Sequence, residues 1–429
     1  MEKLFQLQQR GTNVRRELMA GLTTFLTMAY ILAVNPGMLS MTGMPIGGVF
    51  TATALASAIA CVCMAFLANL PVALAPGMGL NAFFTFSVVM GMGYSWQLAL
   101  TAVFLEGILF IFLSIFNVRK AIIEAIPSNL KKAVAVGIGL FIALIGFANA
   151  GIVVNDGGTV IGLTQNLASP APLLAFVGLV IIIVLYSLKV PGSILIGILA
   201  TTVIGIISGV TAIPQGWVPV SLPAAPLLFK FEFHNVLTLK FFTVFFTFLF
   251  VDIFDTVGTL VGVSTQAGLI DKDGNIPKVN QALLSDSIGT VAGAALGTST
   301  VTSYVESTAG VAAGGRTGLT ALSTGALFLL ALVLSPVFLL IPGFATAPAL
   351  IFVGYLMMAP VVQIDFKDPT EGIPAFLAIV MMPFAYSIAD GIQYGILSYV
   401  LLKAVTGKFK EIPIVTWVLF VVFAIKLFL

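Results

Sequence analysis

Long apolar segments separated by short polar linkers run along nearly the whole chain. About fourteen of them contain about 17–22 residues, which is enough for a helix to cross a hydrocarbon core of about 30 Å. This pattern predicts an all-α polytopic membrane protein. The expected spans cover residues 17–38, 48–69, 71–91, 96–116, 130–149, 171–189, 192–211, 240–266, 279–296, 300–316, 317–340, 347–364, 372–388 and 390–406.

One segment, GTSTVTSYVESTAGVAAGGRTGLT at residues 297–320, departs from this pattern. It begins with hydroxyl side chains around a β-branched valine, which favours extended backbone. Such backbone is stable at membrane depth only where protein or a water-filled cavity satisfies its polar groups. We therefore predict a short extended piece followed by a half-helix whose first turns carry Glu306. Broken helices of this kind are typical of secondary transporters.

The third apolar segment, PVALAPGMGLNAFFTF, contains a second interruption. Pro76 suits the first position of a half-helix, and an extended Val72–Ala75 could pair with Thr300–Ser303. The N-termini of the two half-helices would then point inward. At an offset of 225 residues, Asn81 would occupy the place equivalent to that of Glu306.

Short motifs recur about half a chain length apart. Ile126-Pro127 before one apolar span returns as Ile341-Pro342, and Tyr186-Ser187 returns as Tyr386-Ser387. Because seven is an odd number, seven spans followed by seven more would enter the membrane from opposite sides. The sequence therefore predicts a 7+7 inverted repeat.

Composition agrees with a membrane protein and excludes a soluble globular domain, since 59% of the residues are hydrophobic and only 8% are charged. The net charge of +2 gives no indication of nucleic-acid binding. If every span crosses, most basic residues fall on one side, which the positive-inside rule makes cytoplasmic together with the N-terminus. These residues include Lys3, Arg10, Arg15, Arg16, Arg119, Lys120, Lys131, Lys132, Lys189, Lys272, Lys278, Arg316, Lys367, Lys403, Lys408 and Lys410.

Four acids stand out inside the expected spans: Glu106, Asp252, Asp255 and Glu306. We find no Lys or Arg well inside any of these spans, so no intramembrane cation is expected to pair with the acids. A buried carboxylate without a partner tends to take up a proton, which is a physical basis for proton coupling. The alternative is that some are simply protonated and bonded to backbone. Asp252 and Asp255 share one helix face, which Thr259 extends, and one of the two is expected to hold a proton at neutral pH.

The same residues indicate which ligand would suit the site. Helix N-termini carry partial positive charge and free N–H groups, while the acids and Asn81 supply acceptors. A fixed anion would meet several carboxylates and no arginine, so a flat neutral heterocycle fits better. Phe83, Phe84, Phe254 and Tyr304 offer stacking surfaces or serve as packing. We find no metal-ligand cluster, nucleophile–base pair or phosphate loop, and we expect no cofactor and no enzyme activity.

Four motifs resemble the nucleobase/ascorbate transporter (nucleobase:cation symporter-2) superfamily, specifically its AzgA-like branch of purine permeases. They are GLTTFLTMAYILAVNP (21–36), APGMGLNAFF (75–84), VDIFDTVGTL (251–260) and the segment 297–320. The resemblance implies a 7+7 inverted repeat divided into a core and a gate domain, with short strands in spans three and ten. It also implies a substrate site between the two domains, and dimers are common in the family.

The resemblance further implies that Asn81, Asp252, Asp255 and Glu306 are the essential polar positions, with Glu306 holding the base by its ring edge. It does not rank the two aspartates. Related uracil transporters have a histidine where Thr259 stands, so a proton route cannot be copied from them.

The function expected from these observations is proton-coupled import of adenine, guanine or hypoxanthine by alternating access. The partners would be the base, the proton and the lipid bilayer of the cytoplasmic (inner) membrane, with a homodimer as a further expectation. The alternatives are a transporter of another polar or anionic solute on the same fold, or an ion channel. The expected domain parts are core 1–116 and 240–340, gate 117–211 and 341–406, and a C-terminal hydrophobic segment 407–429, of which 412–429 is either interfacial or a fifteenth span.

Overall fold

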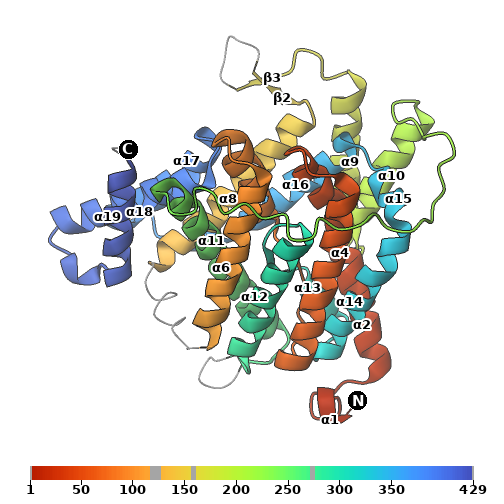
Figure 1. Ribbon diagram of the computed structural model, residues 1–429, viewed down its shortest axis with the longest axis horizontal. Helices are drawn as coiled ribbons and strands as arrows, with labels where there is room; N and C mark the ends of the chain where they lie inside the picture. Colours follow the sequence, from red (N-terminus) through yellow and green to blue (C-terminus); the bar gives the residue numbers. More distant parts are fainter. Residues whose placement is uncertain (1, 116–126, 156–160, 271–275, 428–429) are drawn as a thin grey trace.

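The computed structural model describes residues 2–115, 127–155, 161–270 and 276–427. The motif residue Ile126 and the basic residues Arg119, Lys120 and Lys272 lie outside the described residues. Helices make up most of the described chain, and they form a bundle with the C-terminal helices at one side (Figure 1).

The helices of the first half are α1 (Glu2–Phe5), α2 (Val14–Met28), α3 (Ile31–Ser40), α4 (Ile46–Cys63), α5 (Met78–Ala82), α6 (Trp96–Ile115), α8 (Ser128–Asn149), α9 (Pro170–Ser187) and α10 (Ser193–Ile207). Two π-helical segments, η1 (Met64–Ala68) and η2 (Phe83–Gly91), continue α4 and α5.

The helices of the second half are α11 (Leu239–Gln266), α12 (Val279–Leu296), α13 (Ser307–Ala312), α14 (Gly318–Ala331), α15 (Ser335–Leu339), α16 (Gly343–Met357), α17 (Pro369–Phe384), α18 (Ile388–Val405) and α19 (Ile414–Leu427). Short 3-10 turns are η3 (Leu332–Leu334), η4 (Ala359–Gln363) and η5 (Phe409–Glu411). A minor hairpin is made of β2 (Val153–Val154) and β3 (Gly162–Leu163).

Each predicted span contains a helix or a strand followed by a helix. Within the described residues, nine helical stretches are both long and apolar enough to cross a membrane by themselves. Shorter apolar helices cover further predicted spans, and they include α10, α17 and the continuous α5–η2 stretch. The chain is thus a multi-pass helical protein, and the number of segments that cross remains a prediction.

The long helices pack in two groups. In the first, α2 and α4 both contact α14, and α6 contacts α11 and α12. In the second, α8 contacts α16 and α17, α9 contacts α10 and α16, and α17 contacts α18. Both groups draw helices from both halves of the chain, so each half contributes to each group.

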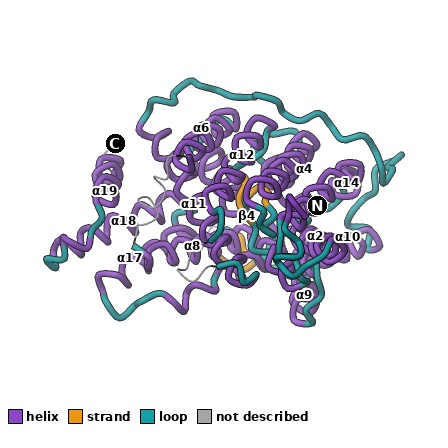
Figure 2. The backbone as a smooth tube through the Cα atoms, turned by 90° about the horizontal axis from the view of Figure 1, so that it is seen from below, coloured by secondary structure: helices purple, strands orange, loops and turns teal. Residues whose placement is uncertain are grey.

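A strand pair lies near the centre of the molecule, surrounded by helices (Figure 2). Strand β1 (Leu74–Pro76) pairs antiparallel with β4 (Val301–Ser303), with Ala75 opposite Thr302. The predicted pairing of the two broken segments is confirmed, but two details were wrong. The first strand begins two residues later than predicted, and Pro76 ends it instead of opening the half-helix. Proline is tolerated here because it occupies a strand end, where its missing N–H group breaks no central ladder.

The polar backbone of the strand pair is satisfied inside the protein. The Thr290 hydroxyl accepts from the N–H of Val301 at 3.2 Å and donates to its carbonyl oxygen at 3.0 Å. The N–H of Gly77 donates to the carbonyl oxygen of Thr300 at 3.0 Å. A Cβ atom on Gly77 would lie 2.7 Å from the Thr302 hydroxyl oxygen. The extended segments are therefore compatible with membrane depth, and glycine permits the close approach.

Glu17 joins the start of α2 to the start of α14. Its fully buried carboxylate accepts hydrogen bonds from the N–H groups of Arg316 and Thr317 at 2.9 and 3.2 Å, and from the hydroxyls of Thr317 and Thr320 at 2.8 and 2.6 Å. The carboxylate thus caps a helix N-terminus, where negative charge is favoured.

We expect Glu17→Ala to lower the apparent free energy of unfolding by on the order of 3 kcal/mol, because it leaves several buried donors without an acceptor. Thermal unfolding of the purified protein in detergent measures the effect. The exposed Glu2 offers a matched control, and Glu2→Ala should unfold like the original protein. Equal unfolding temperatures for the two variants would contradict the role of Glu17.

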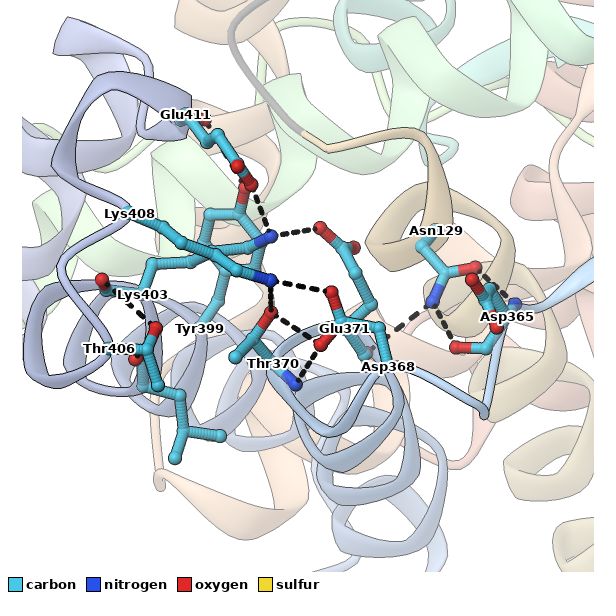
Figure 3. A network of polar contacts seen from close by, with 11 residues as sticks. Asn129, Asp365, Asp368, Thr370, Glu371, Tyr399, Lys403, Thr406, Lys408 and Glu411 are labelled. Atoms are coloured by element: carbon cyan, nitrogen blue, oxygen red, sulfur yellow. Dashed lines mark hydrogen bonds and ion pairs between the residues drawn. The ribbon is translucent and has the colours of Figure 1, made fainter.

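A polar network joins η5 to α17 and α18 (Figure 3). Lys403 is buried in α18, and its ammonium lies 2.9 Å from a carboxylate oxygen of Glu371 and 2.6 Å from one of Glu411. The hydrogen bond from Lys408 holds the pKa of Asp368 well below its usual range. The sequence places Lys403 among the charges that flank a span, whereas the structure shows a buried cation that is neutralised by two acids near the end of its helix.

Candidate functional site

Glu306 occupies the break between β4 and α13, where it is the N-cap residue of α13. Its carboxylate accepts a hydrogen bond from the Tyr30 hydroxyl at 2.6 Å, and its carbonyl oxygen lies 3.4 Å from the Thr27 hydroxyl. Tyr30 is buried in the interruption between α2 and α3, whereas Glu306 is only half-buried. The predicted half-helix with Glu306 at its start is confirmed.

Close packing of α13 on α2 fixes this position. Gly310 faces α2 so tightly that a Cβ atom would collide with the Thr24 hydroxyl and would lie 2.7 Å from the carbonyl oxygen of Ala20. The small residues of the segment therefore let α13 approach α2 until Tyr30 can reach Glu306.

The two aspartates of α11 have different surroundings. Asp255 is half-buried, lies beside Thr302 of β4, and faces the charge of Glu306. Asp252 is fully buried one turn earlier, and its neighbours are Glu106 and Asp286. The sequence placed both on one helix face without ranking them. Of the two, only Asp255 lies close enough to Glu306 for their charges to interact.

Asn81 is fully buried in α5 and bonds to the strand region. Its side-chain oxygen accepts from the Ser299 hydroxyl, and its amide nitrogen lies 3.4 Å from the Pro76 carbonyl oxygen. The predicted equivalence with Glu306 was wrong, because Asn81 is the fourth residue of α5 whereas Glu306 precedes the first residue of α13. Through these bonds, Asn81 connects the broken segment that contains β1 and α5 with the one that contains β4 and α13.

The start of α13 offers fewer free donors than predicted. The N–H of Ser307 donates to the carbonyl oxygen of Tyr304 at 3.1 Å, and the N–H of Thr308 donates to the carbonyl oxygen of Val305 at 2.9 Å. A ligand beside Glu306 would therefore be recognised chiefly by side chains.

The aromatic candidates divide into packing residues and accessible ones. Phe83 and Phe84 are buried against Phe248. The centroid of the Phe248 ring lies 4.8 Å from that of Phe83 and 6.4 Å from that of Phe84. Phe254 is half-buried, and the Lys131 ammonium lies 5.2 Å from its ring centroid. Since Phe254 precedes Asp255 on α11 and Lys131 belongs to α8, this contact joins the two packed groups of helices next to the candidate site.

Two residues at or near the candidate site were missed from the sequence. Asp286 lies inside an expected span and is fully buried, yet it was not counted among the intramembrane acids. Tyr30 lies in the motif at residues 21–36, which is one of the four that resemble the transporter family. A tyrosine inside an apolar segment could have indicated a polar role for this position. Among the described residues, no group of three or more His, Cys, Asp and Glu side chains is arranged to hold a metal ion.

The sequence profile of the Permease family, the nucleobase/ascorbate transporter family, matches residues 15–394. The chain belongs to this family. It is therefore a multi-pass membrane transport protein and not an enzyme.

Two relatives that align over nearly the whole chain are named after the bases they transport. Guanine/hypoxanthine permease PbuO of Bacillus subtilis is 46% identical over 99% of this chain and 100% of its own length. Adenine permease AdeQ of Escherichia coli is 43% identical over 100% of this chain and 96% of its own length.

Among solved structures, the transmembrane domain of the cyanobacterial bicarbonate transporter BicA matches with a TM-score of 0.68. The match covers 88% of this chain and 97% of that domain at 19% identity. At this identity the likeness concerns the fold alone, and it confirms the predicted 7+7 inverted repeat.

Proposed function

We propose that this transporter imports purine nucleobases together with protons across the cytoplasmic membrane, with adenine, guanine and hypoxanthine as the candidate substrates. The observation that carries the proposal is the pair Asp255 and Glu306, two half-buried acids that lie within electrostatic reach of each other beside the central strand pair. The substrate class is supported by the adenine and guanine/hypoxanthine permeases that align with the full chain.

The pair suits a neutral heterocycle with N–H groups on its ring edge. A carboxylate accepts two or more hydrogen bonds, and the charge that acts on Asp255 comes from another acid, Glu306. An anionic solute would be repelled by both. Phe254, which precedes Asp255 in α11, is contacted by the Lys131 ammonium and by the Phe250 ring, whose centroid lies 4.4 Å from its own. A flat base could stack on Phe254 once the contact with Lys131 opens.

Alternating access would follow from the two packed groups of helices. We propose that the first group is the core domain, which carries Glu306 and Asp255, and that the second is the gate domain. Neutralisation of an acid among Asp252, Asp255 and Glu306 by a proton would let the loaded core move against the gate, because an uncompensated charge is costly in a low-dielectric interface. Lys131 on Phe254 is a contact that such a movement would break or form.

Uptake of radiolabelled adenine, guanine, hypoxanthine and uracil tests the proposal in cells that lack their own base permeases. We expect saturable uptake of at least one purine, abolished by a protonophore, and little uptake of uracil. Uptake that a protonophore does not reduce would contradict proton coupling. Protein present in the membrane without uptake of any base would favour an anionic or other solute, and unitary currents without accumulation would indicate a channel.

A further inference from the structure

Three acids from three helices meet behind the candidate site. Glu106 of α6, Asp252 of α11 and Asp286 of α12 are each fully buried, and the side chain of Asp252 neighbours the other two. We call these residues the acid cluster. It lies between the strand pair and the packed helices α6, α11 and α12, one turn of α11 away from Asp255.

The acid cluster has few hydrogen-bond donors. The Thr256 hydroxyl donates to one oxygen of Asp286 at 2.8 Å, and the Ser303 hydroxyl lies 3.4 Å from the same oxygen. The other oxygen of Asp286 and both oxygens of Asp252 and Glu106 receive no hydrogen bond from another described group. The buried Thr300 hydroxyl, which also has no partner among the described residues, lies beside Glu106.

The charges around the cluster have the same sign. Asp255 lies on α11 one turn from Asp252, and Glu306 lies beyond it. The charged neighbours that act on the three cluster residues are all acids. Adjacent carboxylates in a buried, low-dielectric interior cannot all be ionised, so at least one of the acids holds a proton. Shared between two of the acids, that proton also supplies a hydrogen-bond donor within the cluster.

The cluster is also connected to the strand that leads to Glu306. The Thr256 hydroxyl, which donates to Asp286, lies 3.4 Å from the N–H of Ser303 in β4. Asp255 on the next turn contacts Thr302 of the same strand. A change of charge on Asp286 therefore alters the hydrogen bonding of Thr256 and, through it, of β4.

We propose that the acid cluster binds the coupling proton, separately from the base, and that Glu106 and Asp286 are proton-binding residues of the transporter. The proposal rests on the proposed function. The coupling proton adds to the one that the cluster already shares. It binds a carboxyl oxygen of Glu106 or Asp252 when the site faces outward and leaves when the site faces inward, so the three acids are never all ionised. Asp255 and Glu306 then remain available to the base.

The test uses the purified transporter in proteoliposomes and the purine found by the uptake experiment. Counterflow of labelled base at equal pH reports binding and movement of the site, whereas accumulation driven by an alkaline interior reports proton coupling. We expect Glu106→Gln and Asp286→Asn to keep counterflow within about threefold of the original protein and to lose pH-driven accumulation at least about tenfold. Glu2→Gln, the same chemical change on the surface, should behave like the original protein.

Binding provides a second readout. Because proton and base affinities are linked reciprocally, base affinity in the original protein should change by about tenfold across neutral pH, whereas that of Glu106→Gln should be nearly constant. Accumulation and pH dependence like those of the original protein in Glu106→Gln would overturn the proposal. So would joint loss of counterflow and base binding, which would make Glu106 a structural residue. Absence of base counterflow in the original protein would instead refute the proposed function itself.

Discussion

Replacing Glu306 by Gln is expected to reduce purine accumulation about tenfold to a hundredfold. Glutamine keeps the size of the side chain and an oxygen that can accept from Tyr30, whose hydroxyl lies 2.6 Å from the carboxylate. It removes the charge and one of the two acceptors that would face the base. Hydrogen bonds to charged groups are worth about 1.5–3 kcal/mol, which corresponds to this loss of affinity.

Uptake and equilibrium binding of the labelled base measure the effect of Glu306→Gln. In contrast to Glu106→Gln, this variant should lose base binding as well as accumulation, because Glu306 is proposed to touch the base. Glu2→Gln serves as the matched control. Glu306→Gln that accumulates base as the original protein does would exclude Glu306 from the site.

Replacing Asp255 by Asn is expected to weaken base binding at least about tenfold. Asp255 is half-buried and lies within electrostatic reach of Glu306, so we expect it to accept from the same base. For Asp252→Asn we expect the main effect on the pH dependence of transport, since Asp252 faces Glu106 and Asp286.

Base affinity at several pH values distinguishes the two aspartates. Asp365→Asn is the matched control, because Asp365 is exposed in the turn before α17 and should not affect binding. If Asp252→Asn weakens binding more than Asp255→Asn does, the assignment of the two residues is reversed and the base must lie next to the acid cluster.

Much of the architecture could be predicted from the sequence because its determinants are local. The length of apolar segments sets the helices, and hydroxyl and β-branched residues around Val301 predict the extended piece before Glu306. The N-cap position of Glu306 in α13 and the antiparallel pairing of β1 with β4 both agree with that reading. The predicted start of β1 was two residues too early. Proline is common both at the end of a strand and at the start of a helix, so the sequence around Pro76 does not tell the two apart.

A helical membrane protein with two broken segments and unusual intramembrane acids therefore follows from the order of the residues alone. Which of these acids meet depends on how the helices pack. Asp252 and Asp255 share a helix face, yet one faces α6 and α12 whereas the other faces β4 and Glu306. Helical periodicity gives the direction of a side chain on its own helix, but its neighbours belong to helices that are distant in sequence. Glu106, Asp252 and Asp286 become one cluster only when those helices pack.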